Sequence, residues 1–314
     1  SVLRAVRADR WGWRSYLLAR LTRLYVVLLP ALLLGGILDW TGMHLPGTGV
    51  VYSGQSGMHA LAMDVHKTLT LPTLAGNSLF LQTIALPGFH DITLPAFGSN
   101  GPLWSLSNEF WYYMAFPLLV LLAARGRSWP TRVACGLGLL LWGWFVGSSI
   151  ALLGIPWLMG ALIVDLPPVP SSRYWVRGLA MLGAFAMFAT GLVLSKQHEG
   201  ALAFDLILGV AVTFLIWVTL HWAKAPLPSA YVRVAQRAAR SSYTLYLVHL
   251  PLVIFLKASF HIERTVPGWH MFLVAGTILL GAVVYAQLVY QLFERNTDHI
   301  RNWIKPHELG RQSA

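Results

Sequence analysis

Long apolar segments are the feature that most limits what this chain can fold into. A helix needs about 20 apolar residues to cross the roughly 30 Å hydrocarbon core of a bilayer. Seven segments reach or approach that length, namely 24–40, 105–124, 133–152, 178–195, 202–223, 242–260 and 270–293. Two shorter apolar segments, 75–86 and 154–165, fit half-helices, re-entrant segments or short spans. We therefore predict an all-α, polytopic transmembrane helix bundle with seven clear spans and eight or nine in total.

The composition of the chain supports this prediction. Hydrophobic residues make up 56% of the 314 residues and charged residues only 11%, whereas a soluble domain has about 25% charged residues. So few ionic groups cannot cover a soluble surface, and so apolar a chain is not disordered. A single cysteine, Cys135, excludes an internal disulfide framework. The histidines show no metal-ligand spacing, so we expect no metal site.

The distribution of positive charge predicts the orientation of the bundle. With the N-terminus in the cytoplasm, all but four of the 23 basic residues lie on the cytoplasmic side, the exceptions being Lys67, Lys196, Lys257 and Arg264. This asymmetry follows the positive-inside rule and accounts for the net charge of +11 without a nucleic-acid partner. Both visible termini are then cytoplasmic. The connection 41–101 is extracytoplasmic and either covers a site or packs on the bundle without a role.

Glu109 and His249 are ionisable residues inside predicted spans, where charge is costly and usually faces a partner or a cavity. Glu109 lies just inside the outer end of 105–124, where it either orients a hydroxyl substrate or belongs to an aromatic belt at the interface. His249 shares one helix face with Ser242 and Tyr246, because these residues are three and four positions apart. This polar face is expected to line the bundle interior or a wet cavity. It serves either proton transfer or hydrogen bonding between helices.

Two arginines stand at the cytoplasmic mouth of the first span. Arg20 and Arg23 are three positions apart, so their guanidinium groups point the same way on a helix. Guanidinium groups bind phosphate bidentately, which favours an anion site. The alternative is simple anchoring at the inner interface.

Four segments, taken in their order along the chain, together point to one protein family. They are Arg20-Leu-Thr-Arg23, the run from Asn100 through Trp104-Ser105-Leu-Ser-Asn-Glu109-Phe-Trp-Tyr-Tyr113, Ser241-Ser242-Tyr-Thr-Leu-Tyr246-Leu-Val-His249, and Phe293-Glu294-Arg295. This set resembles the bacterial integral-membrane acyltransferase-3 family. The second segment is the most specific of the four.

The resemblance implies a single membrane domain, 1–314, that acts as an O-acyltransferase in the bacterial inner membrane. Such an enzyme moves an acyl group, commonly acetyl, from acetyl-CoA to a hydroxyl of a surface or exported polysaccharide or of its lipid-linked precursor. It implies a donor site at Arg20 and Arg23 and catalytic roles for Glu109 and His249. The residues expected to bind the acceptor or support the site are Trp104, Ser105, Tyr113, Ser242 and Tyr246.

The resemblance also implies a missing part. Members of the family begin with two further helices, and the first of these carries an arginine and the histidine proposed as catalytic base. Because the chain opens just before Arg20, we expect an N-terminal truncation with the main catalytic histidine upstream of Ser1.

Two other functions stay open from the residues alone. In a proton-coupled small-molecule transporter, Glu109 and His249 would belong to the proton path. In a non-catalytic partner of a polysaccharide-export complex, the same residues would only hold helices together.

Overall fold

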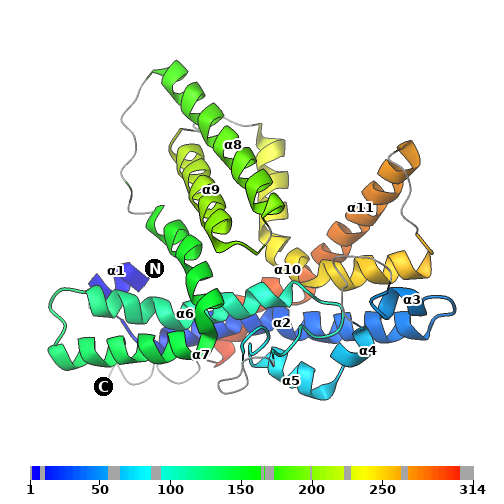
Figure 1. Ribbon diagram of the computed structural model, residues 1–314, viewed down its shortest axis with the longest axis horizontal. Helices are drawn as coiled ribbons and strands as arrows, with labels where there is room; N and C mark the ends of the chain where they lie inside the picture. Colours follow the sequence, from blue (N-terminus) through cyan, green and yellow to red (C-terminus); the bar gives the residue numbers. More distant parts are fainter. Residues whose placement is uncertain are drawn as a thin grey trace. The chain divides into compact units, whose positions relative to one another are not determined.

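The computed structural model describes residues 2–7, 11–55, 64–85, 93–163, 166, 173–198, 200–222, 228–262 and 268–304. Long helices make up most of this part of the chain (Figure 1). They are α2 (Trp13–His44), α6 (Leu103–Ala123), α7 (Trp129–Leu162), α8 (Tyr174–Gln197), α9 (Leu202–Trp222), α10 (Ser229–Ser259) and α11 (Trp269–Leu292). The shorter elements are α1 (Val2–Arg7), α3 (Gly49–Tyr52), α4 (Val65–Thr68), α5 (Leu71–Ser78), η3 (Glu294–Asn296) and α12 (Thr297–Ile304).

The prediction of an all-α polytopic bundle is confirmed. Each of the seven predicted apolar segments lies almost wholly within one long helix, and six of these helices are long and apolar enough to cross a membrane. The exception among the seven is α6, whose first half carries the polar run between Trp104 and Tyr113. Over the described residues the only β-structure is a pair of isolated bridges between 82–85 and 93–94.

Over their described residues, neither of the two short apolar segments forms a helix of its own that could span the membrane. The segment 154–165 continues α7, and the helix is interrupted instead at Gly147, whose φ of 79° and ψ of 168° are not helical. Glycine tolerates this conformation because it has no Cβ. The segment 75–86 contains the end of α5, and residues 79–85 follow it as irregular chain. Residues 86 and 164–165 lie outside the described residues.

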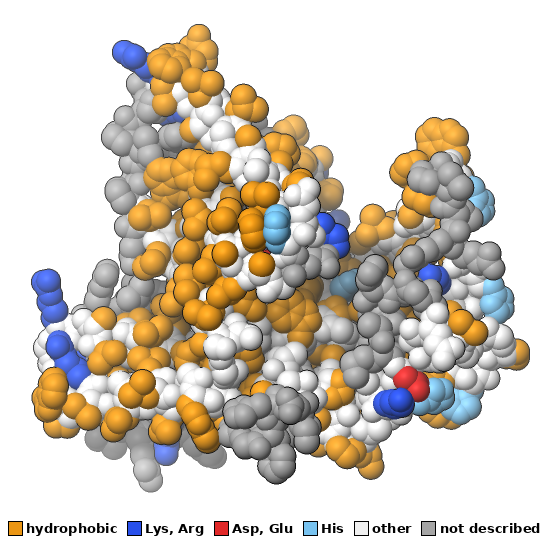
Figure 2. Space-filling model, viewed as in Figure 1, with side chains coloured by type: hydrophobic (Ala, Val, Ile, Leu, Met, Phe, Trp, Pro, Cys, Tyr) orange, Lys and Arg blue, Asp and Glu red, His pale blue; other side chains and the backbone are white. Residues whose placement is uncertain are grey.

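Helix contacts divide the chain into two compact units, and the smaller one comprises residues 141–232. Within it, α8 and α9 pack along each other, and a Cβ added to Gly191 would lie 3.4 Å from the Cα of Leu208. Small residues allow membrane helices to approach this closely. Large apolar side chains are exposed on both helices, such as Leu182 and Phe185 of α8 and Ile207 and Leu220 of α9. Figure 2 shows hydrophobic side chains gathered over these helices. Such a surface suits contact with lipid rather than with water.

The larger unit, residues 1–140 and 233–314, contains α2, α6 and α10. The Tyr16 hydroxyl donates to the Tyr113 carbonyl at 2.9 Å and thereby joins α2 to α6. The Asn100 amide donates to the Leu247 carbonyl at 2.8 Å and joins the turn before α6 to α10. These side-chain bonds to distant carbonyls fix the relative register of the three helices.

The connection between α2 and α6 is part of the core of this unit. The Ser107 hydroxyl donates to the Phe80 carbonyl at 2.7 Å, and the Gln82 amide donates to the Leu103 carbonyl at 2.8 Å. Tyr52 and Val65 are fully buried and pack against Ile254 and Ala258 of α10, which form one apolar cluster with them. The described residues of 41–101 that make these contacts therefore pack on the bundle.

The sharpest constraint in this connection is Gly98. Its φ is +60°, and a Cβ added there would lie 2.2 Å from Oδ2 of Asp39. Asp39 is buried and accepts the Ser99 backbone N–H at 2.7 Å and the Ser99 hydroxyl at 2.6 Å. An added methyl group would break these bonds.

We expect Gly98→Ala to lower the free energy of unfolding by about 3 kcal/mol, which sums backbone strain with the loss of charge-assisted hydrogen bonds. Gly126→Ala is the matched control, because Gly126 has a φ of +85° but no atom within 4 Å of an added Cβ. This control should cost about 1 kcal/mol, from strain alone. Denaturation of the two purified variants tests this difference, and equal losses of stability would contradict the assigned contact.

Candidate functional site

A polar stripe runs along one face of α6. Ser105, Glu109 and Tyr113 are spaced four residues apart, and this spacing places them on the same helix face. The Tyr113 hydroxyl donates a hydrogen bond to Oε1 of Glu109. A carboxylate has two oxygens with several lone pairs, so Glu109 keeps the capacity to accept further hydrogen bonds. The stripe is half-buried at Ser105 and Glu109 and buried at Tyr113.

The two arginines of α2 lie beside this stripe. The guanidinium carbon of Arg20 lies 4.7 Å from the ring centre of Tyr113 and 5.5 Å from that of Tyr16. These are cation–π distances, which hold a guanidinium group in place over a ring. Arg20, Tyr113 and Glu109 therefore form one connected group.

This contact changes the expected depth of Glu109. From the sequence we placed it near the outer face, with Arg20 and Arg23 on the inner side. In the structure one tyrosine bridges Glu109 to Arg20, so the two lie at similar depth. The reason is that α6 begins inside the folded connection, with Leu103 and Ser107 already bonded to Gln82 and Phe80.

Helix α10 completes the cluster with residues that the sequence analysis did not select. The guanidinium carbon of Arg23 lies 5.8 Å from the ring centre of Tyr243. Tyr243 is within electrostatic range of Glu109, Tyr113 and Glu294. Its hydroxyl is buried and has no hydrogen-bond partner among the described residues. An unpartnered buried hydroxyl is costly in a fold, which makes it a candidate donor to a ligand.

The far edge of the cluster is Glu294, in η3 just after α11. The Thr244 hydroxyl donates a hydrogen bond to Oε2 of Glu294, and Glu294 also interacts electrostatically with Arg23. The sequence did contain a signal for this pair. Thr244 lies three residues after Ser241 on the buried face of α10, and Glu294 stands in the conspicuous Phe-Glu-Arg segment.

The predicted stripe of Ser242, Tyr246 and His249 lies on one face of α10, but on its more exposed face. The expectation that it lines the bundle interior is wrong, because the apolar residues and Thr244 take the buried face. Among the described residues, Ser242 bonds its own helix, donating to the Ala239 carbonyl at 2.9 Å.

Tyr246 connects this stripe to α6, since its hydroxyl oxygen accepts the Ser105 hydroxyl at 2.8 Å. His249 lies one turn further along. Its Nδ1 is 3.0 Å from the carbonyl oxygens of Leu245 and Tyr246. Because carbonyls only accept, we assign the ring proton to Nδ1, which leaves Nε2 as an acceptor.

The two predicted catalytic residues do not meet. Tyr113 lies near Tyr243, and Asn100, just before α6, bonds the Leu247 carbonyl. Because the later residue of the α6 segment meets the earlier residue of α10, the two helices run antiparallel. Glu109 therefore lies on one side of the Ser105–Tyr246 hydrogen bond and His249 on the other. From the rise of 1.5 Å per residue, the levels of Tyr243 and His249 are about 9 Å apart. Trp104, at the start of α6, is exposed beside the His249 end.

A small pocket of about 210 Å³ adjoins the arginine end of the cluster. Arg20, Tyr16, Ser15 and Trp11 line it, with apolar residues of α1 on the other side. The indole N–H of Trp11 is buried and has no hydrogen-bond partner among the described residues. The pocket thus combines a cation, aromatic rings and unused donors, which suits an anionic ligand with a planar group.

Comparison with known proteins gives one match. The family model described as "Acyltransferase domain" matches residues 4–287 of the 314-residue chain, which include the cluster on α2, α6 and α10. No curated protein and no solved structure matches the chain with significance.

Proposed function

Since this chain belongs to the acyltransferase family that matches residues 4–287 and is a membrane acyltransferase, we propose a specific reaction for it. It transfers an acetyl group from acetyl-CoA to a hydroxyl of an exported or cell-surface polysaccharide or of its lipid-linked precursor. The observation that carries the proposal is the cluster in which Arg20 and Glu109 share Tyr113 while Arg23 covers Tyr243. We place the protein in the bacterial inner membrane with both visible termini in the cytoplasm, in agreement with its basic residues.

The arginines form the donor site in this proposal. Coenzyme A carries phosphates and an adenine ring, and guanidinium groups and aromatic rings bind these chemical groups. Arg20 and Arg23 are held over tyrosine rings, so little side-chain freedom is lost when a phosphate binds. The pocket beside Arg20, with the free indole N–H of Trp11, supports the same assignment.

Glu109 is the catalytic residue at the reacting hydroxyl. The acceptor oxygen attacks the thioester carbonyl, its new bond to the acyl carbon forms, and the carbon–sulfur bond breaks. Glu109 accepts the hydroxyl proton through an oxygen not occupied by Tyr113, and the proton then passes to the departing thiolate of coenzyme A. The Tyr243 hydroxyl, unpartnered among the described residues, donates to the oxyanion that develops on the acyl oxygen.

The second polar group holds the acceptor. Nε2 of His249 accepts a hydrogen bond from an acceptor hydroxyl one or two turns from Glu109, and the Ser105–Tyr246 pair lies between them. The exposed Trp104 ring offers a surface on which a sugar ring stacks. Ser242, which bonds its own helix, supports α10 without touching substrate.

Membranes that carry the full-length protein test the proposed reaction. We expect labelled acetyl-CoA to give labelled polysaccharide or lipid-linked saccharide, with one coenzyme A thiol released for each ester formed. A matched membrane without the protein is the control. Release of free acetate with no labelled saccharide would contradict the proposed acceptor, and transfer from other acyl-CoA donors only would contradict acetyl as the group moved.

Removal of one hydroxyl tests the role of Tyr243. We expect Tyr243→Phe to lower kcat by about 100-fold, the usual effect of losing one oxyanion donor, with little change in the KM for acetyl-CoA. Because the hydroxyl has no partner among the described residues, the variant should keep its thermal stability. Tyr290→Phe on α11, outside the cluster, is the matched control. A kcat within twofold of the wild type in Tyr243→Phe would remove this residue from the proposed mechanism.

A further inference from the structure

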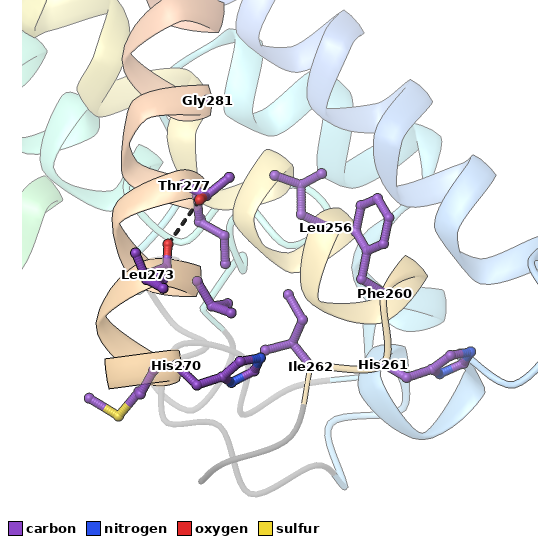
Figure 3. A pocket seen from close by; sticks show the side chains of 11 residues that line it. Leu256, Phe260, His261, Ile262, His270, Leu273, Thr277 and Gly281 are labelled. Atoms are coloured by element: carbon purple, nitrogen blue, oxygen red, sulfur yellow. Dashed lines mark hydrogen bonds between the residues drawn. The ribbon is translucent and has the colours of Figure 1, made fainter. Parts of the chain in front are cut away.

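A second and larger cavity lies away from this cluster. It has a volume of about 810 Å³ and lies between the last turns of α10 and the first half of α11 (Figure 3). Ligand sites typically have volumes of roughly 300–1,000 Å³. Leu256 and Phe260 form the wall on α10, and Leu273 and Ile278 belong to the wall on α11. The Thr277 hydroxyl in this wall is already used, since it donates to the Leu273 carbonyl at 2.8 Å.

The rim of the cavity is polar at one end. His261 directly follows the last turn of α10, and His270 is the second residue of α11. Figure 3 shows the His270 ring directed toward Ile262, whereas the His261 ring points away from the cavity. Cε1 of His261 would lie 3.0 Å from a Cβ added at Gly47. Trp269 beside His270 is almost fully exposed. An exposed tryptophan at the end of an apolar helix is typical of the membrane interface.

These features together describe a site for an amphiphile. Both walls belong to helices that are long and apolar enough to span a membrane, so the lining suits a hydrocarbon chain. The imidazole N–H of His270 is a donor for a phosphate at the rim. Lys257, one turn before His261, adds positive charge at the same end.

We propose that this cavity binds one anionic phospholipid of the surrounding membrane. A hydrocarbon chain lies between Leu256 and Phe260 on one side and Leu273 and Ile278 on the other, and the phosphate is hydrogen-bonded at His270. The site is independent of the proposed reaction. Leu256 is thirteen residues from Tyr243 on α10, which corresponds to about 20 Å along the helix. Lipid binding is therefore measurable without an activity assay.

Two glycines of α11 provide a matched test. Gly281 lines the cavity, whereas Gly276 on the same helix does not. A Cβ added at either position meets no atom within 4 Å, so neither position is closely packed. Gly281→Leu places a side chain in the cavity. Gly276→Leu makes the same chemical change outside it, with the same gain in helix propensity.

The experiment uses full-length protein in vesicles of phosphatidylcholine and phosphatidylglycerol at a ratio of 4:1. A trace of phosphatidylglycerol carries a photoreactive group in its acyl chain, and labelled peptides are mapped after irradiation. We expect label on α10 and α11 in the wild type and in Gly276→Leu, and at least about tenfold less in Gly281→Leu, equivalent to a loss of about 1.4 kcal/mol. Equal labelling of the two variants would overturn the site.

Further measurements test which head group and which class of lipid the cavity binds. We expect His270→Leu to reduce labelling by phosphatidylglycerol about tenfold, as befits one lost charge-assisted bond. Unlabelled phosphatidylglycerol should compete with the probe on wild-type protein, a measurement that needs no variant to fold. Equal labelling by a phosphatidylcholine probe would contradict an anionic lipid. Labelling by a polyprenyl phosphate probe alone would contradict a phospholipid.

Discussion

Glu109→Gln is expected to lower the rate of acyl transfer by two to four orders of magnitude, about the contribution of a positioned acid or base. Glutamine keeps the shape of the side chain, and its amide oxygen still accepts the Tyr113 hydroxyl, so the cluster should stay assembled. What is lost is the group that accepts the proton of the attacking hydroxyl. The measurement is the rate of ester formation with saturating acetyl-CoA.

A second carboxylate offers the control for this variant. Asp298 is exposed and pairs with Arg301 at 2.9 Å on α12, outside the cluster. Asp298→Asn removes a carboxylate in the same way and should leave the rate unchanged, because an exposed ion pair contributes little to stability. Retention of more than half of the wild-type rate in Glu109→Gln would show that Glu109 takes no part in the proton transfer.

The double variant Arg20→Gln, Arg23→Gln is expected to raise the KM for acetyl-CoA by about 100-fold or more. Each lost charge-assisted bond to a phosphate is worth about 1.5–3 kcal/mol, and each 1.4 kcal/mol is a factor of ten. The turnover number should fall less, because the arginines bind a part of the donor that does not react. Initial rates over a range of acetyl-CoA concentrations separate the two effects.

Conservative variants and a neighbour on the same helix sharpen this test. Arg20→Lys keeps the charge but loses the planar group over Tyr113, so we expect an intermediate KM. Arg14 is exposed in the first turns of α2, and Arg14→Gln also removes one positive charge near the same end. If Arg14→Gln raised the KM as much as the double variant, the effect would come from general charge and not from a donor site.

The sequence predicted the helices well and the depth of single residues less well. All seven long apolar segments form helices, because burial of an apolar run in a membrane leaves the backbone little choice other than a helix. The ends of these helices were harder to predict. Helix α2 begins eleven residues before the apolar run at 24, and its first turns carry the basic residues.

The contacts of the site depend on the connection between α2 and α6, whose fold has no periodic signal. Gln82 and Phe80 bond the first turns of α6, and this helps to place Tyr113 of α6 beside Arg20. On α10, spacing correctly grouped Ser242, Tyr246 and His249 on one face. Spacing alone could not show which face packs inward, and so Tyr243 and Thr244 were missed.

The measurement that tests the central claim most directly is acyl transfer by the purified full-length protein in vesicles. Acetyl-CoA with a labelled acetyl group is supplied on the side of Arg20 and Arg23, together with a saccharide acceptor. We predict label in a saccharide ester that mild base releases, and loss of that signal in Glu109→Gln. Uptake of the saccharide without acetyl-CoA, with no ester formed, would contradict the account and favour a transporter.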